Sequence, residues 1–133
     1  MRKFKKTICL MLTVLAMAST SVVAYAATTT FNITVGGSNP VVKSKRTLKS
    51  GTNYDNNFYV TATAINPPGG RIYAKSIKLD GTLDSERVFI EETNTTYSAA
   101  YNGNAPYDEY YYLEGSMEGP GAGMVKVSGR YTP

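Results

Sequence analysis

The stretch that decides the fold is Phe58-Tyr59-Val60-Thr61-Ala62-Thr63-Ala64, in which every second residue is apolar. Successive side chains of a β-strand point to opposite faces. The alternation therefore predicts a strand that buries Phe58, Val60 and Ala62 and turns Tyr59 and Thr61 away from the core. The same period of two recurs in three further segments, at residues 30–35, 110–117 and 124–131.

Weaker strand patterns and turn residues fill most of the remaining chain. The weaker patterns lie at residues 41–49, 71–79 and 86–92. Asp80-Gly81 predicts a two-residue hairpin turn, and the glycine-rich segment 118–123 predicts a longer hairpin loop between the last two strands. No segment shows a capped 3.6-residue period. The pattern predicts an all-β fold, an antiparallel β-sandwich (Ig-like or jelly-roll-like) of about seven short strands.

The first 26 residues have the three regions of a secretory signal peptide. Four basic residues precede an apolar run from Ile8 to Ala18, and Ala24-Tyr25-Ala26 supplies a small-residue cleavage site. The apolar run is too short to span a bilayer permanently. We expect residues 1–26 to be removed and residues 27–133 to form a single secreted domain with no stable membrane insertion.

The charge of the chain is unevenly distributed. The formal net charge of +4 equals the charge of the four basic residues before Ile8, so residues 27–133 are neutral. A neutral domain is not expected to bind nucleic acid. Residues 27–78 carry seven basic residues and one acidic residue, whereas residues 79–133 carry three basic and nine acidic residues. We expect the basic and acidic strands to pair within one molecule.

The composition leaves little for catalysis. The only cysteine, Cys9, lies in the signal segment, and the chain has no histidine. A thiol nucleophile, a thiolate metal site and the commonest general base are therefore missing from the domain. The adjacent acids Glu91-Glu92 and Asp108-Glu109 face opposite sides of a strand, so neither pair converges on one substrate. We expect the protein not to be an enzyme and to need no cofactor.

One acidic segment could bind calcium. Asp80, Thr82, Asp84 and Glu86 place oxygen atoms at alternate positions beside a glycine turn, and calcium prefers oxygen ligands. Their spacing differs from that of an EF-hand loop, and acidic hairpin turns are common without a metal. We therefore expect no metal site.

Two groups of residues are candidates for binding. Tyrosine combines a rigid ring with a polar tip and suits contact with sugars or proteins. The surface aromatic candidates are Tyr97, Tyr101, Tyr107, Tyr110 and Tyr112. A basic patch of Lys43, Lys45 and Lys49 is expected on one strand face, where it could contact anionic wall polymer. The alternatives are ordinary strand tyrosines at the sheet rim, and lysines that discourage edge-to-edge aggregation.

The closing segment Val127-Ser128-Gly129-Arg130-Tyr131, the signal peptide and the all-β pattern resemble small exported β-sandwich proteins of Gram-positive bacteria. That group includes uncharacterised Bacillus-type proteins and the lactococcin 972-like bacteriocins. The second resemblance implies a secreted antibacterial protein that acts at the cell-wall precursor of sensitive cells. The chain lacks the tryptophans expected of those bacteriocins.

These observations together favour a small secreted binding protein that acts without catalysis at or near the cell envelope. Its expected partner is a cell-wall polymer, a wall precursor or a protein. A bacteriocin-like antibacterial protein is the second hypothesis, and an enzyme is a distant third.

Overall fold

The computed structural model describes residues 27–50, 55–117 and 123–133. These residues form nine β-strands and no helix, which confirms the predicted all-β class. The strands are β1 (Thr29–Val35), β2 (Val41–Lys43), β3 (Thr47–Lys49), β4 (Asn57–Asn66), β5 (Ile72–Lys78), β6 (Val88–Ile90), β7 (Thr96–Ala100), β8 (Glu109–Ser116) and β9 (Val125–Thr132).

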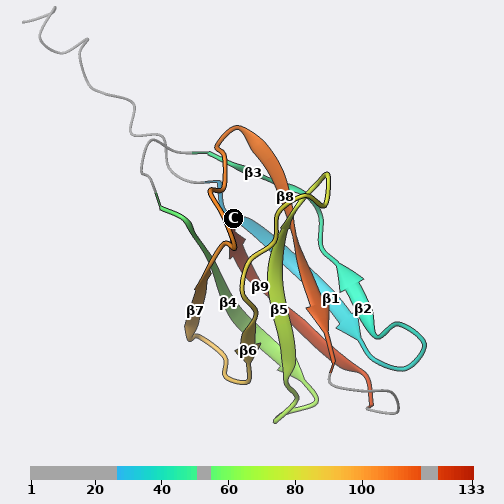
Figure 1. The fold of residues 1–133 in the computed structure, drawn as a ribbon. Coiled ribbons are helices and arrows are strands. Elements are labelled where there is room, and N and C mark those ends of the chain that lie inside the picture. The colour runs from blue at the N-terminus through green and yellow to red at the C-terminus, as the bar shows by residue number, and fades with distance from the viewer. Residues whose placement is uncertain (1–26, 51–54, 118–122) are drawn as a thin grey trace, which may run out of the picture.

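The strands build two antiparallel sheets packed face to face (Figure 1). The first sheet has the order β1-β9-β4-β7. The second sheet has the order β2-β8-β5-β6, and β3 also pairs with β8. Every strand pair is antiparallel, so the predicted sandwich is confirmed.

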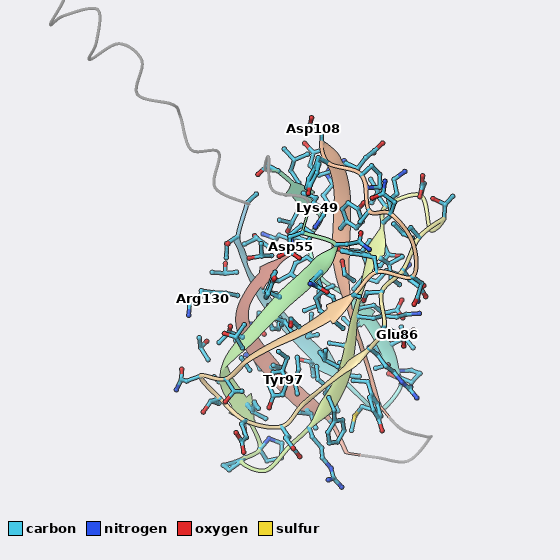
Figure 2. The ribbon with its side chains drawn as sticks, turned by 60° about the vertical axis from the view of Figure 1, so that its left-hand side comes forward. Lys49, Asp55, Glu86, Tyr97, Asp108 and Arg130 are labelled. Carbon is cyan, nitrogen blue, oxygen red and sulfur yellow. The ribbon has the colours of Figure 1, made fainter. Side chains whose placement is uncertain are left out.

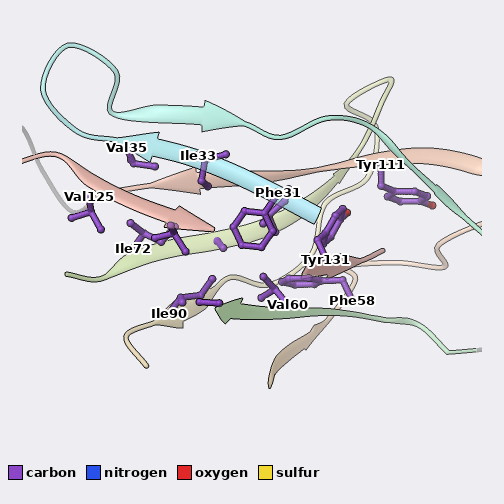
Figure 3. Packing of buried hydrophobic residues seen from close by; sticks show 14 of the residues in the cluster. Phe31, Ile33, Val35, Phe58, Val60, Ile72, Ile90, Tyr111, Val125 and Tyr131 are labelled. Atoms are coloured by element: carbon purple, nitrogen blue, oxygen red, sulfur yellow. The ribbon is translucent and has the colours of Figure 1, made fainter. Parts of the chain in front are cut away.

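Alternate side chains of both sheets form the core between them (Figure 3). In β4, Phe58, Val60 and Ala62 are fully buried, while Tyr59 and Thr61 are only half-buried, as the alternation predicts. The rings of Phe58 and Tyr131 meet edge to face, with centroids 6.3 Å apart. Burial of such large side chains contributes on the order of 2–3 kcal/mol each to the free energy of unfolding.

A buried group of hydroxyls joins the two sheets inside the core. The Ser76 hydroxyl of β5 lies 2.6 Å from the Tyr101 hydroxyl and 2.5 Å from the Tyr131 hydroxyl of β9. Burial raises the pKa of both phenols, so they stay protonated and can donate hydrogen bonds. These bonds satisfy polar groups that would otherwise be costly inside the core.

The strand predicted over residues 41–49 is interrupted at Ser44. The side chains that follow the interruption point to the opposite faces from those that the predicted alternation gives them. At the interruption, the Ser44 amide donates to the Leu113 carbonyl, and the Ser44 hydroxyl accepts from the Leu113 amide. Both contacts occupy positions where β8 would otherwise pair with a regular strand. As a result Lys43 lies on the outer face but Lys49 lies on the inner face, and the prediction that they share a face is wrong.

Two predicted turns also differ. The Lys78 amide donates to the Leu83 carbonyl, so the turn after β5 contains four residues instead of two. Gly81 in this turn has a φ of +74°, which suits glycine. The predicted hairpin between the last two strands is wrong, because β8 pairs with β5 in the second sheet while β9 pairs with β1 and β4 in the first. Residues 118–122 lie outside the described residues.

The strand β7 has no counterpart among the predicted strands. Its sequence, Thr96-Tyr97-Ser98-Ala99-Ala100, alternates but contains only one large apolar side chain. The predicted signal peptide, residues 1–26, lies outside the described residues. Within the described part, no helix has the length and apolar character needed to cross a membrane.

Candidate functional site

Aromatic rings and cations gather on the outer face of the second sheet. Each of four rings on this face has a cationic side chain lying over it. We call this surface the aromatic–cationic face. Its members are Lys43, Arg46, Arg71, Tyr73, Arg87, Phe89, Tyr110 and Tyr112.

Two short repeats on neighbouring strands build one half of this face. Arg71-Ile72-Tyr73 leads into β5 and Arg87-Val88-Phe89 leads into β6. Tyr73 and Phe89 are directly opposite in the antiparallel pair, and their ring centroids lie 4.9 Å apart. The Arg71 guanidinium lies 5.5 Å from the Phe89 ring, and the Arg87 guanidinium lies 4.4 Å from the Tyr73 ring. Each arginine therefore contacts the ring of the neighbouring strand.

The other half of the face lies along β8. The Lys43 ammonium is 4.6 Å from the centre of the Tyr112 ring, and the Arg46 guanidinium is 4.8 Å from the Tyr110 ring. The Tyr112 hydroxyl, and to a smaller extent the Glu114 carboxylate, raises the pKa of Lys43. Lys43 thus remains a cation at every physiological pH. Cation–ring contacts at exposed sites contribute about 0.5–1 kcal/mol each.

Opposite charges from the two halves of the chain pair across β8. Glu114 of β8 is the direct cross-strand partner of Lys43 on one side and of Lys75 on the other. The Lys75 ammonium lies 3.0 Å from the Asp84 carboxylate. This placement confirms the expectation that basic and acidic strands pair within one molecule. The pairs are partly exposed, so each contributes about 1 kcal/mol or less.

The arginines of the face are not neutralised in this way. Among the described residues, no carboxylate forms an ion pair with Arg46, Arg71 or Arg87. Their charge is held over a ring, which orients the guanidinium without consuming its hydrogen-bond donors. The planar fork of arginine matches carboxylate and phosphate geometry. This arrangement can bind an anionic ligand with little reorganisation.

The predicted surface tyrosines fall into three groups. Tyr110 is 40% exposed and joins the aromatic–cationic face. Tyr97 and Tyr107 are half-buried, and the Tyr97 hydroxyl accepts hydrogen bonds from the amides of Glu91 and Glu92.

Tyr101 and Tyr112 are only 5% and 8% exposed, so the prediction that they lie on the surface is wrong. Tyr101 turns inward to meet Ser76. Tyr112 is screened on the outer face by Lys43 and by its cross-strand partner Ile77.

The three lysines of the predicted basic patch do not lie together on the surface. Lys43 and Lys45 are exposed, but Lys49 is only 4% exposed and is not part of a surface patch. The Lys49 ammonium donates to the main-chain oxygen of Pro133 at 2.8 Å and lies 5.1 Å from the Tyr101 ring. Burial lowers the pKa of Lys49. Figure 2 shows Lys49 beside Asp55, at the same end of the sandwich as Asp108.

In the acidic segment considered for calcium, the carboxylate oxygens of Asp80 and Asp84 contact other protein groups. One Asp80 oxygen accepts hydrogen bonds from the amide and hydroxyl of Thr82, and the other lies 3.1 Å from the Lys78 ammonium. The Asp84 carboxylate contacts Lys75 and Asn102. Within the described ranges no three acidic, cysteine or histidine side chains come together as metal ligands.

Five members of the face were missed by sequence reasoning: Arg46 and the two pairs Arg71–Tyr73 and Arg87–Phe89. For the two pairs the sequence did contain a usable signal. The usable signal was the repeated arginine-x-aromatic spacing in two neighbouring strand segments. Residues two apart share a strand face, so each repeat places a cation and a ring on the same side. Their contact also depends on β5 and β6 being paired, which the turn around Gly81 brings about.

No family model, no curated protein and no solved structure matches this chain. Its function has therefore to be inferred from its own surface chemistry.

Proposed function

We propose that residues 27–133 act outside the cell as a small non-enzymatic binding protein at the cell envelope. The binding surface is the aromatic–cationic face, and the ligand is an anionic envelope polymer such as a phosphate-rich wall polymer. The observation that carries this proposal is the set of four cation–ring pairs on one face of the second sheet.

The spacing of the cations supports an extended ligand. They come from both ends of the face, with Arg71 and Arg87 around β5 and β6, and Lys43 and Arg46 beside β8. A polymer with repeated negative charges can contact several of them at once. Each contact is weak, but linked contacts raise the overall affinity. The exposed ring of Tyr110 and the half-buried rings of Tyr73 and Phe89 add apolar area to the same surface.

The electrostatic setting also favours an anion. Two acids beside this surface, Glu114 and Asp84, already face Lys43 and Lys75. The guanidinium groups therefore keep their charge available for a ligand. Such binding weakens as salt screens the charges over about 8–10 Å.

The test is co-sedimentation of the protein with purified Gram-positive cell walls, before and after acid extraction of their phosphate polymers. We expect binding to intact walls that falls on extraction and in high salt. The double variant Arg71→Gln/Arg87→Gln should bind about tenfold more weakly, because it removes two of the four cation–ring pairs.

The matched control is Lys126→Gln/Arg130→Gln, which removes the same charge from exposed positions of β9 in the first sheet. It should bind like the original protein. Equal losses in both variants would show that net charge, and not this face, drives binding. Killing of related Gram-positive cells by the purified protein would favour the bacteriocin-like alternative.

A further inference from the structure

The first sheet has a long unguarded edge. β1 pairs with β9 on one side only, and its seven residues continue in register without a bulge. Its sequence, Thr-Thr-Phe-Asn-Ile-Thr-Val, contains no charged residue and no proline. Natural sheets usually protect such edges with charges, prolines, bulges or very short strands. β1 has none of these devices.

The other edge strands of the described residues are shorter. β6 has three residues and follows the charged pair Glu86-Arg87. β2 and β3 have three residues each and are separated by the interruption at Ser44. β7 has five residues, and the carbonyl of its last residue, Ala100, accepts a hydrogen bond from the Glu86 amide. Among the described strands at a sheet edge, β1 is therefore the longest without such protection.

β1 and β2 lie side by side at the margin of the sandwich (Figure 1). A groove of about 440 Å³ lies at this margin. One wall is the outer side of β1, and the other is the segment that leaves β2. The lining includes Thr30, Phe31, Asn32, Lys43, Ser44 and Lys45. The groove therefore combines the β1 edge, which pairs with no second strand of the described residues, with two lysines on the other side.

The lysines define the charge of the occupant. Lys45 is exposed, and no carboxylate of the described residues forms an ion pair with it. Lys43 lies over the Tyr112 ring at the same margin. An extended chain hydrogen-bonded to β1 places every second side chain on one face. Acidic residues at alternate positions would therefore meet these lysines.

We propose that an acidic peptide segment of a partner protein adds to β1 as a fifth strand of the first sheet. The main-chain hydrogen bonds give affinity, and Lys43 and Lys45 select carboxylates at alternate positions. This surface and ligand differ from those of the aromatic–cationic face, although Lys43 borders both. A second copy of the chain fits less well, because pairing two β1 strands would bring the lysines of both copies together.

The experiment uses a fluorescein-labelled acetyl-Thr-Glu-Val-Glu-Val-Glu-Thr-amide peptide, with binding followed by anisotropy and by amide hydrogen exchange of the protein. We expect saturable binding and slowed exchange of the β1 amides. Replacing the glutamates of the peptide by glutamines, or methylating alternate peptide nitrogens, should each weaken binding more than fivefold. Lys45→Gln should weaken it about threefold, whereas the control Lys126→Gln should not.

The outcomes separate this proposal from the proposed function. Arg71→Gln/Arg87→Gln should leave peptide binding intact even where it abolishes wall binding. Equal binding of the methylated and unmethylated peptides would overturn strand addition. Protection of β7 instead of β1, or a stable dimer with β1 protected before peptide is added, would overturn the assignment of this edge.

Discussion

The two outer faces of the sandwich cover the same core but carry different chemistry. On the first sheet, a row of cross-strand partners runs Thr30, Arg130, Thr61 and Thr96. Hydroxyls on this face pair with each other, as the Thr61 and Thr96 hydroxyls do at 2.8 Å. On the second sheet, the corresponding positions carry rings, cations and ion pairs.

The difference shows that the alternation that buries a core determines the inward residues only. The outward residues of the two sheets can differ in type without affecting the core. Hydroxyl pairs such as Thr28–Thr132 and Thr61–Thr96 satisfy each other locally. The guanidinium groups of Arg46, Arg71 and Arg87 form no ion pair with a described carboxylate, so the face of the second sheet has more to offer a charged ligand. Responses to salt and pH should therefore arise mainly from the second sheet.

The largest expected effect comes from breaking the core that both faces share. Val60→Asp buries a charge without a partner and should abolish the cooperative unfolding transition in urea. The control Thr61→Asp changes the neighbouring residue, which faces outward opposite Arg130, and should cost less than about 1 kcal/mol. If Val60→Asp unfolds at the original urea concentration, the inward face of β4 is wrongly assigned.

The second largest effect on stability is expected from removing the buried hydroxyl contacts between the sheets. Ser76→Ala removes the hydroxyl that both Tyr101 and Tyr131 contact. Leaving buried phenols without a partner should lower the free energy of unfolding by about 2 kcal/mol. Urea denaturation measures it, with the exposed Ser98→Ala of β7 as the control. A loss below about 0.5 kcal/mol would show that the two phenols satisfy each other.

A smaller effect, in the opposite direction, is expected at Thr47 in the second sheet. Its side chain is buried, and its hydroxyl has no hydrogen-bond partner within the described ranges. Thr47→Val keeps the shape of the side chain and removes the unsatisfied hydroxyl, so it should raise the free energy of unfolding by about 1 kcal/mol. Thr96→Val, on the outer face of the first sheet, should change it little. Destabilisation by Thr47→Val would reveal a partner for the hydroxyl.

The smallest expected effect is on the stability of the fold at low pH, through the Asp80 carboxyl. The Thr82 hydroxyl and amide, together with the Lys78 ammonium, lower the pKa of Asp80 to about 2. A carboxyl whose pKa is lowered on folding stabilises the fold above its unfolded pKa of about 4 and loses this contribution as the pH falls toward 2. Asp80→Asn should therefore reduce the fall in melting temperature between pH 5 and pH 2.

The control for this prediction is Asp108→Asn, an exposed residue for which the described part of the chain shows no ion pair. If both variants change the acid sensitivity equally, the effect comes from total charge and not from the turn around Asp80.

Features of the fold and of the binding face could be predicted from the sequence where they depend on neighbouring residues alone. Features that depend on the pairing of distant strands could not. The inward residues of β4 follow from its own alternation, so Phe58 and Val60 were assigned correctly. The face of Lys49 did not follow, because Ser44 interrupts the strand and exchanges the faces beyond it.

The contact of Arg87 with Tyr73 could not be predicted either, since it requires the register between two strands. Local periodicity predicts burial, whereas the binding face depends on which strands become neighbours.

The hydroxyl tie between Ser76, Tyr101 and Tyr131 also affects how the domain reaches its native state. Residues 27–133 contain no cysteine, so the two sheets are joined without any covalent cross-link that an oxidant must form. Assembly therefore needs no thiol chemistry and no disulfide isomerase. A thiol reductant should leave both the refolding rate and the final stability unchanged, and the domain can fold equally well in oxidising and in reducing surroundings.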